Sequence, residues 1–160
     1  MADILFKTED AVFSYRVAGV MVQNGKVLLQ RPAGVCEYAF PGGHVAFFET
    51  NAQTLMREFR EEMGAQIKVG NLMWVGEVFF PWGKKPCHQI CLYYKVEPVS
   101  GIPLDRNFHG TEQLENLTFK LCFEWHDIDR LSALELYPPQ CREFLKLPED
   151  QVQHFIYHEA

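Results

Sequence analysis

The sequence lacks long apolar runs and clusters of basic residues. No stretch of its 160 residues is apolar over the roughly 20 positions that a membrane-spanning helix needs. Residues 1–10, MADILFKTED, show neither the basic start nor the apolar run that is typical of a signal peptide. The formal net charge is −6, and the lysines and arginines are scattered, which disfavours nucleic-acid polymers as partners. We therefore expect a cytoplasmic protein without a membrane partner.

The cysteines do not follow any spacing that zinc sites use. Their number is odd, and they are Cys36, Cys87, Cys91, Cys122 and Cys141. We expect reduced and mostly buried thiols, as in other cytoplasmic proteins. Linkers, low-complexity tracts and internal repeats are also lacking. Because 48% of the residues are hydrophobic, the chain can bury a sizeable core, and we expect a single domain over residues 1–160.

One acidic stretch organises the rest of the chain. Residues 43–65 read GHVAFFETNAQTLMREFREEMGA and predict a helix that ends at Gly64. At about 100° per residue, Glu58, Glu61 and Glu62 cover an arc of roughly 100° on this helix. Apolar residues at helical spacing occupy the adjoining face. One face therefore anchors the helix, and the next presents three clustered carboxylates.

Clustered carboxylates repel one another and destabilise the helix that carries them. Arg57, one turn before Glu61, offsets part of this repulsion. A hard divalent cation offsets the rest, because Mg²⁺ and Mn²⁺ prefer oxygen ligands and bind through a few carboxylates, waters and substrate phosphates. The alternative is a solvated, charged helix face that binds nothing. The acids taken alone favour this alternative, whereas the spacing around them favours a metal site.

That spacing resembles the Nudix box, G-x5-E-x7-R-E-U-x-E-E-x-G-U, where U is a bulky apolar residue. The matching positions are Gly43, Glu49, Arg57, Glu58, Phe59, Glu61, Glu62 and Gly64. A match over so many fixed positions is far more specific than a lone glycine pattern. The sequence departs from the family habit at Ala65, the final apolar place, and at Ala46 and Phe48, where a glutamate and a glycine are common. Phe48 either reshapes the loop or faces a ligand or partner, which bears on substrate preference more than on chemistry.

The resemblance to the Nudix family, which extends over most of residues 12–147, implies a fold and a reaction. The implied fold is α/β, an α/β/α sandwich around a mixed β-sheet. The implied enzyme is a pyrophosphohydrolase that uses Mg²⁺ or Mn²⁺ and water to cleave a nucleoside diphosphate linked to another moiety. Nucleoside triphosphates, nucleotide sugars and ADP-ribose are substrates of this type. Two alternatives remain open, a nucleotide-sensing domain without activity and an RNA-cap or RNA pyrophosphohydrolase.

The resemblance also implies roles for the residues of the box. Glu58, Glu61 and Glu62 are the expected metal ligands, and Glu61 is either a ligand or the base that activates water. Glu49 and Arg57 are expected to orient this cluster, Arg57 by pairing with a glutamate so that its carboxylate points at the metal.

Candidate substrate-binding residues lie outside the helix. In the family, an arginine at the place of Arg31 often holds substrate phosphates. A later loop often supplies a general base, and here Glu112 or Glu115 can serve. A subgroup of small nucleotide-type hydrolases has a histidine where this chain has His88. For each of the four, an ordinary solvated or hydrogen-bonded residue is the alternative.

Two further features indicate contacts with a ligand. Gly42 and Gly43, just before the helix, let the backbone turn tightly and approach a ligand closely. Phe80 and Trp82 border a turn, and we expect them to be the aromatic residues that stack on the substrate. The other aromatic residues of this region should pack in the core.

β-branched and aromatic runs predict the remaining elements. We expect a hairpin turn at Asn24-Gly25 and strands over residues 12–22, 26–31, 66–80, 88–96 and 119–125. The strand over 66–80 is either continuous or broken near Gly70.

The rest of the chain carries weaker signals. Residues 97–118 are polar and rich in turn formers, and they predict a substrate loop. Residues 140–147 predict a short helix that follows two prolines. The tail from Glu149 packs either on the core or on a second subunit, in a homodimer.

Overall fold

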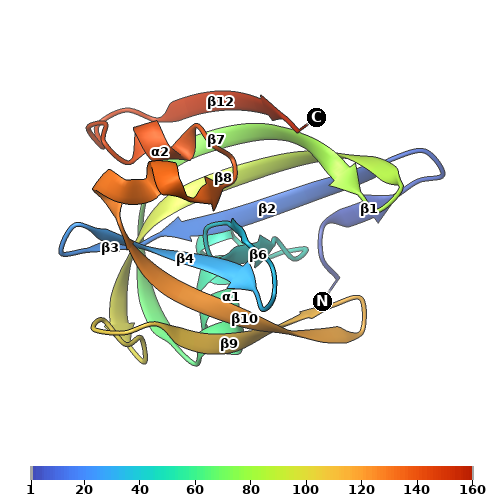
Figure 1. The fold of residues 1–160 in the computed structure, drawn as a ribbon. Coiled ribbons are helices and arrows are strands. Elements are labelled where there is room, and N and C mark those ends of the chain that lie inside the picture. Colours follow the sequence, from blue (N-terminus) through green and yellow to red (C-terminus); the bar gives the residue numbers. More distant parts are fainter. Residues whose placement is uncertain (1, 160) are drawn as a thin grey trace.

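The computed structural model describes residues 2–159, which form two large sheets and a short two-stranded one, with helices on both sides (Figure 1). The larger sheet has six strands in the order β1-β2-β8-β7-β12, with β6 beside β2. These strands are β1 (Leu5–Lys7), β2 (Val12–Val20), β6 (Gly42–His44), β7 (Gln66–Trp82), β8 (Lys85–Ser100) and β12 (Gln153–His158). The sheet is mixed, because β2 runs parallel to β8 and β12 runs parallel to β7, while the other pairs are antiparallel.

The smaller sheet is antiparallel and has the order β3-β4-β10-β9. Its strands are β3 (Val22–Gln23), β4 (Lys26–Pro32), β9 (Phe108–Leu114) and β10 (Leu117–Asp127). The short strands β5 (Glu37–Tyr38) and β11 (Glu135–Leu136) form a separate parallel pair. Between β3 and β4, Asn24 and Gly25 have φ angles of 52° and 75°, as a type I′ turn requires. The predicted hairpin is confirmed.

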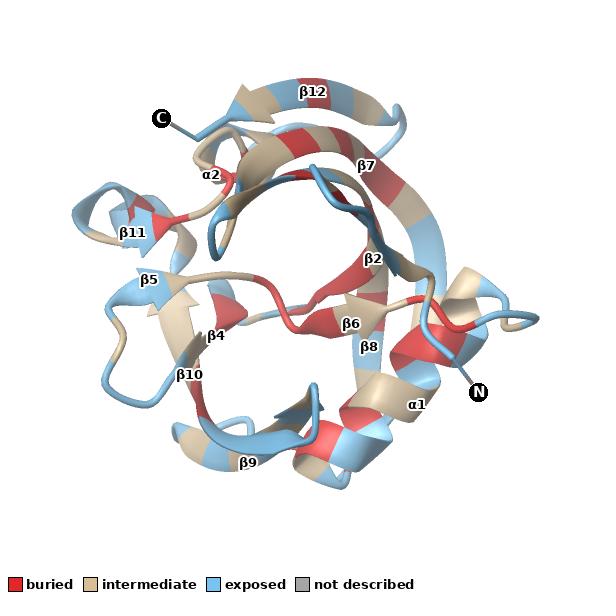
Figure 2. Cartoon of the chain, turned by 90° about the vertical axis from the view of Figure 1, so that its right-hand side faces the viewer, coloured by how far each residue is buried: buried red, intermediate tan, exposed pale blue. Residues whose placement is uncertain are grey.

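Alternation along the strands directs side chains into two separate cores. In β4, Val27 and Leu29 face one core and Leu28 faces the other. The first core includes side chains of the 3₁₀ helix η1 (Ile128–Ala133) and of α2 (Cys141–Phe144). The second includes side chains of α1 (Asn51–Met63). Figure 2 shows α1 and α2 on opposite sides of the sheets. The predicted α/β/α sandwich around a mixed sheet is confirmed.

Helix α1 has well-defined ends. The Thr50 side chain accepts a hydrogen bond from the backbone N–H of Gln53, whose side chain accepts one from the backbone N–H of Thr50. This reciprocal capping box satisfies two donors that the helix itself cannot. At the other end, Gly64 adopts a left-handed φ of 69° and its N–H donates to the carbonyl of Arg60, which is the usual glycine cap.

The segment predicted as a substrate loop contains a strand instead. β8 continues to Ser100, and β9 runs from Phe108 to Leu114. The half-buried positions of β9 alternate with exposed ones, so the segment does follow a strand period. The period was not evident in the sequence because two of its half-buried positions are Gly110 and Glu112, neither of which is apolar.

Two other elements also differ in length from the prediction. β7 runs through Gly70 without interruption, although its register with β8 shifts between Val69 and Leu72. Helix α2 spans only Cys141–Phe144, which is shorter than the predicted helix over residues 140–147. Among residues 2–159, no helix combines the length and apolar character needed to cross a membrane.

The tail packs on the core. β12 pairs in parallel with β7, and Phe155 is buried with an exposed fraction of 5%. Its ring fills the space above Gly76, where an added Cβ would lie 2.4 Å from Phe155 Cζ. The neighbouring Ile156 points outward and is 52% exposed. A glycine on β7 therefore makes room for the aromatic anchor of the tail.

Phe155→Ala should lower the free energy of unfolding by about 3 kcal/mol or more, because it removes a buried aromatic ring from a packed core. Ile156→Ala is the matched control, since it removes an exposed side chain from the same strand, and it should cost about 1 kcal/mol or less. Urea denaturation followed by tryptophan fluorescence measures both. Equal effects of the two variants would show that the tail does not pack as described.

Candidate active site

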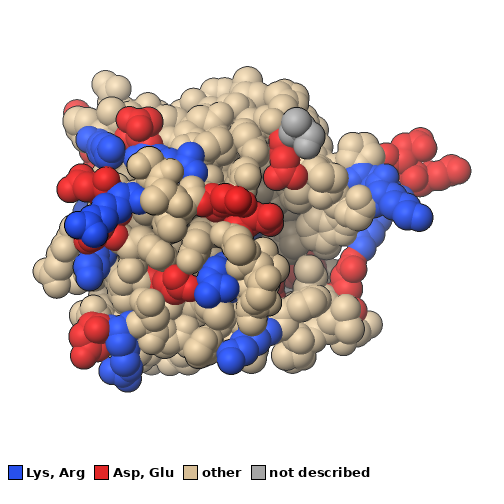
Figure 3. Space-filling model, viewed as in Figure 1, with Lys and Arg blue, Asp and Glu red and all other residues tan. Residues whose placement is uncertain are grey.

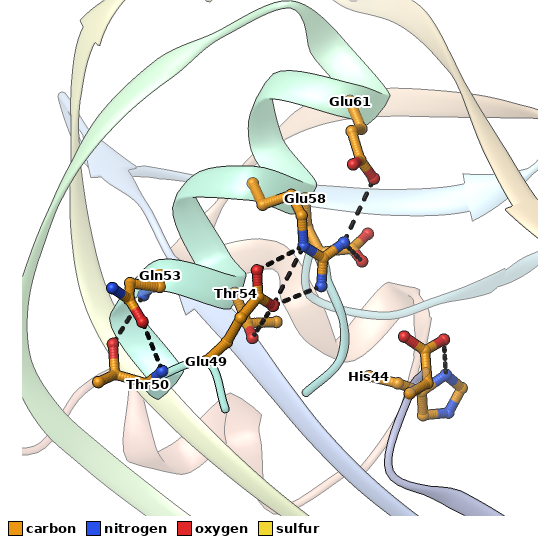
Figure 4. A network of polar contacts seen from close by, with 9 residues as sticks. His44, Glu49, Thr50, Gln53, Thr54, Glu58 and Glu61 are labelled. Carbon is orange, nitrogen blue, oxygen red and sulfur yellow. Dashed lines mark hydrogen bonds and ion pairs between the residues drawn. The ribbon is translucent and has the colours of Figure 1, made fainter. Parts of the chain in front are cut away.

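Arg57 on α1 connects three carboxylates (Figure 4). Its Nε and Nη2 donate to both oxygens of Glu49, at 2.9 to 3.1 Å. Its Nη1 lies 2.9 Å from Glu58 Oε1 and 3.3 Å from Glu61 Oε2. The Thr54 hydroxyl also donates to Glu49, at 2.9 Å. Hydrogen bonding to Arg57 lowers the pKa of Glu49 and raises that of Arg57 itself, so this network stays charged.

Glu62 is the most buried acid of the site, and Glu58 packs closely against β6. An added Cβ at Gly43 would lie 2.4 Å from Glu58 Cδ, so only a glycine on β6 leaves room for that carboxylate. Glu62 is only 5% exposed, and its Oε2 has no hydrogen-bond partner among the described residues. Burial raises the pKa of Glu62, and the neighbouring charge of Glu58 raises it further. A buried carboxylate without a partner is costly, which indicates a site that binds something positive.

Strand β9 passes very close to the end of α1. An added Cβ at Gly110 would lie 2.0 Å from the backbone oxygen of Glu62. This approach places Thr111 and Gln113 beside Glu58, Glu61 and Glu62 around a cavity of about 440 Å³. The same cavity contains Arg57 and, from the N-terminal segment, Asp3. We call it the acidic cavity.

A second cavity of about 310 Å³ lies nearby, and we call it the aromatic cavity. Among the residues that line it are Phe80, Trp82 and Tyr137, together with Arg16, Gln30 and Glu112. Burial raises the pKa of Glu112, while the positive charge of Arg16 opposes that shift. Both aromatic residues that were expected to stack on a substrate therefore line a cavity. Of the other aromatic residues in that region, Trp74 is buried in the core.

The predicted residues of the Nudix box lie close together, whereas the predicted substrate-binding residues lie at different places in the structure. Gly42 and Gly43 form part of β6 beside β2, and an added Cβ at Gly42 would lie 2.0 Å from the Val17 backbone oxygen. Glu112 lines the aromatic cavity. Glu115 lies in the turn after β9, has a φ of 52° and pairs with Lys7.

Arg31 and His88 line neither cavity. The Arg31 Nε donates to Glu124 at 2.8 Å, and its neighbour Gln30 is the residue of β4 that reaches the aromatic cavity. The His88 ring packs against that of Phe79 at 4.5 Å. In the same way, its neighbour Gln89 lines the aromatic cavity.

Phe48 keeps the loop conformation that a glycine usually provides. Its φ is 68°, in the left-handed region, and its side chain is 94% exposed. A bulky residue is strained in this region by about 1 kcal/mol or more. Its ring lies 6.3 Å from that of Phe47, also at the surface. The departure from the family pattern therefore leaves the backbone turn in place and adds an exposed aromatic ring.

The acids fit a hard divalent cation in chemistry. Carboxylate oxygens are the preferred ligands of Mg²⁺ and Mn²⁺, and the unpartnered Glu62 Oε2 is an oxygen without a role in the protein. Among residues 2–159, no three His, Cys, Asp or Glu side chains are already spaced to hold one ion. Arg57 draws Glu58 and Glu61 toward itself, so these side chains have to turn toward an ion to bind it.

Several residues of the two cavities were not predicted from the sequence, among them Asp3, Arg16, Gln30 and Tyr137. Of these residues, only Arg16 has a sequence context that could have indicated a functional role. It is the single charged residue in an otherwise apolar and aromatic run over residues 12–22, and a charge inside a buried strand needs a reason. Asp3 and Tyr137 are distant in sequence, and only the fold brings them here.

The sequence is similar to known pyrophosphohydrolases. The family model described as NUDIX domain matches residues 14–147. A CTP pyrophosphohydrolase from Escherichia coli (strain K12) is 45% identical over 60 residues, which cover 34% of this chain and 43% of that protein. The matched stretch thus spans less than half of the relative's length.

Solved structures with the same fold cover more of the chain. The ORF135 protein of E. coli is 26% identical, with a TM-score of 0.53, and the match covers 84% of this chain and 89% of that one. A MutT protein from Bacillus halodurans is 20% identical, with a TM-score of 0.63, and the match covers 92% of this chain and 90% of that one. Together with the family match over residues 14–147 and the acids on α1, these similarities show that the chain belongs to the NUDIX family of hydrolases.

Proposed function

We propose that the protein is a metal-dependent pyrophosphohydrolase that cleaves the diphosphate linkage of a nucleoside diphosphate linked to another moiety. One observation carries the proposal. A buried carboxylate pair, Glu58 and Glu62, with an unpartnered oxygen opens on the acidic cavity. The aromatic cavity, whose lining can take a nucleoside, is formed in part by β9, which also lines the acidic cavity.

Glu58, Glu61 and Glu62 would hold Mg²⁺ or Mn²⁺. When bound, such an ion neutralises diphosphate oxygens and activates water for attack on phosphorus. Other residues of the protein hold these carboxylates in position. Arg57 and Thr54 fix Glu49, and the Arg57 guanidinium limits how far Glu58 and Glu61 can move from each other.

The exposed fractions of the carboxylate side chains indicate different roles for them. Glu61 is 56% exposed, while Glu58 is 16% exposed. Glu58 and Glu62 are therefore the fixed ligands, and Glu61 is free enough to act as a ligand or to take a proton from water. Glu112 lies in the aromatic cavity, which makes it the second candidate for the general base.

The aromatic cavity suits a nucleoside. Phe80 and Trp82 provide ring faces on which a base can stack. Gln30 and Gln89 provide amide groups that can hydrogen-bond to its edge. Similarity to a CTP pyrophosphohydrolase makes CTP the first compound to test.

Charge disfavours the RNA-processing alternative. Basic and acidic side chains are interspersed on the face shown in Figure 3, and the net charge of −6 would repel a long polyanion. The sensing alternative predicts binding without turnover. The complete set of box acids supports an enzyme, because a domain that only senses nucleotides has no need for all of them.

A panel of CTP and other nucleoside triphosphates, a UDP-sugar, ADP-ribose and capped RNA tests the proposal. With added Mg²⁺ or Mn²⁺, we expect turnover of at least one small nucleotide. EDTA should abolish this turnover and added metal should restore it. Tight binding without turnover across the panel would favour the sensor, and turnover of capped RNA alone would favour RNA processing.

Glu62→Gln should lower kcat/KM by roughly 100-fold or more, because it removes a charged metal ligand. The same change should leave the melting temperature unchanged or raise it, since a neutral amide removes the buried repulsion with Glu58. Glu143→Gln on α2 is the matched control and should change neither quantity. Turnover at the wild-type rate in the Glu62 variant would contradict the metal assignment.

Arg57→Lys keeps a positive charge but loses the fork that holds Glu49, Glu58 and Glu61 together. We expect the Mg²⁺ concentration at half-maximal activity to rise by roughly 10- to 100-fold. Titration of activity against free Mg²⁺ measures this, with Glu49→Gln as a second way to disturb the same network. An unchanged Mg²⁺ dependence in both variants would show that the network does not position the ligands.

A further inference from the structure

Arg16 is the charge in the interior that the proposed reaction has not yet used. It lies in the middle of β2, is half-buried, and lines the aromatic cavity. Its Nη2 donates to the Phe40 backbone oxygen at 2.8 Å, and its Nη1 lies 3.8 Å from Cys91 Sγ. It forms no ion pair with any carboxylate in the part of the chain that the structure describes.

Most other arginines of the chain are paired or solvated. Arg31 pairs with Glu124 at 2.8 Å, and Arg57 pairs with three glutamates. Arg130 is 84% exposed, so water solvates its charge. Arg142 is half-buried like Arg16, but its guanidinium donates to the backbone oxygens of Leu131 and Leu134 and lines neither cavity. A partly buried guanidinium without a carboxylate lowers stability, and Arg16 is the one of these two that faces a cavity where it can bind an anion.

The described groups around Arg16 leave its charge without a paired anion, although Glu112 lines the same cavity. His44 lies opposite Arg16 in the pairing of β2 with β6. Burial lowers the pKa of His44 to about 4, with a contribution from the Arg16 charge, so the ring is neutral at pH 7. Glu62 and Glu112 both feel the Arg16 charge, which opposes the rise in their pKa values. Arg16 lines the aromatic cavity, while its charge also acts on Glu62 of the acidic cavity.

The Arg16 guanidinium has N–H donors that no group of the described residues accepts. It carries five N–H groups in a planar fork, and two of them are directed at Phe40 and Cys91. The contact with the Phe40 carbonyl fixes the plane of the fork, because β2 and the segment before β6 hold both ends. The remaining donors match the geometry of phosphate oxygens, which an arginine fork binds better than a lysine does.

We propose that Arg16 binds the phosphate group that is attached to the nucleoside of the substrate. This inference rests on the proposed function, since it places the nucleoside in the aromatic cavity and the rest of the diphosphate over the acids. Arg16 then joins the two cavities into one site, and its charge balances the phosphate charge that lies farthest from Glu58, Glu61 and Glu62. Arg16 is a substrate-binding residue in this arrangement, and it also aligns the linkage with the acids.

A binding cycle in EDTA isolates this contact from any metal. The affinities of CMP, UMP, GMP and AMP are measured by calorimetry against those of the matching nucleosides, with wild-type protein and with Arg16→Met and Arg16→Lys. For at least one base, the wild type should bind the monophosphate on the order of 10- to 100-fold more tightly than the nucleoside. Arg16→Met should lose this preference and still bind the nucleoside, and Arg16→Lys should keep part of it.

Stability separates a binding role from a structural one. Arg16→Met should keep or raise the melting temperature, because it replaces an unpaired, partly buried charge by an apolar chain of similar length. Arg130→Met, the exposed control, should keep the preference for phosphate. A preference that survives in Arg16→Met, or a wild type that binds none of the four monophosphates, overturns the proposal. If Arg16→Met does not fold, an undiminished preference in Arg16→Lys overturns it.

The same cycle distinguishes this inference from the hydrolase assignment. A preference for phosphate that depends on Arg16, in a protein that turns over nothing on the substrate panel, leaves Arg16 as the phosphate ligand of a sensor. Turnover that depends on Glu62, with an unchanged preference in Arg16→Met, leaves the hydrolase and removes Arg16 from the site.

Discussion

The partial burial of Glu58 and Glu62 at the edge of a cavity is the constraint on which the site depends. Two glycines produce it, because β6 at Gly43 and β9 at Gly110 approach α1 more closely than any side chain would permit. The carboxylates are thereby held in a region of low polarity, where electrostatic interactions are stronger than in water. The apolar face of α1, where Phe59 is fully buried, packs in the core. This packing holds the helix in place despite the electrostatic repulsion between its carboxylates. Packing thus sustains an arrangement of charges that would otherwise separate.

Much of this arrangement follows from local sequence. The helix, its glycine cap and the arc of acids were predictable from spacing, and the strand periods on either side gave the class of fold. Residues such as Glu49 and Arg57 were placed by resemblance to the family, and the structure brings them within hydrogen-bonding distance. Local patterns suffice here because a helix of one and a half turns already juxtaposes the acids.

The second cavity did not follow from the sequence, for a physical reason. Its walls come from β2, β4, β7, β8, β9 and the segment near Tyr137, and no local period relates positions so far apart. Arg31 and His88 show the same limitation for single residues, because the sequence did not indicate which of two adjacent side chains would face the cavity. Their neighbours Gln30 and Gln89 reach the cavity, because adjacent side chains of a strand point to opposite faces. An error of one position in a strand reverses the face, whereas on a helix it shifts the direction only by about 100°.

The parallel pairing of β12 with β7 has a consequence for the order in which the molecule folds. The acids of α1 lie within one helix, so their cluster forms from contacts that are near in sequence, although the walls of the acidic cavity also need Asp3 and β9. The aromatic cavity includes Tyr157 and Glu159 together with Phe80 and Trp82, and it is complete only when the far end of the described chain joins the sheet. Contacts between distant residues form slowly, since the intervening chain must lose its freedom first. We therefore expect the helix that carries the acids to form before the cavity that surrounds the base.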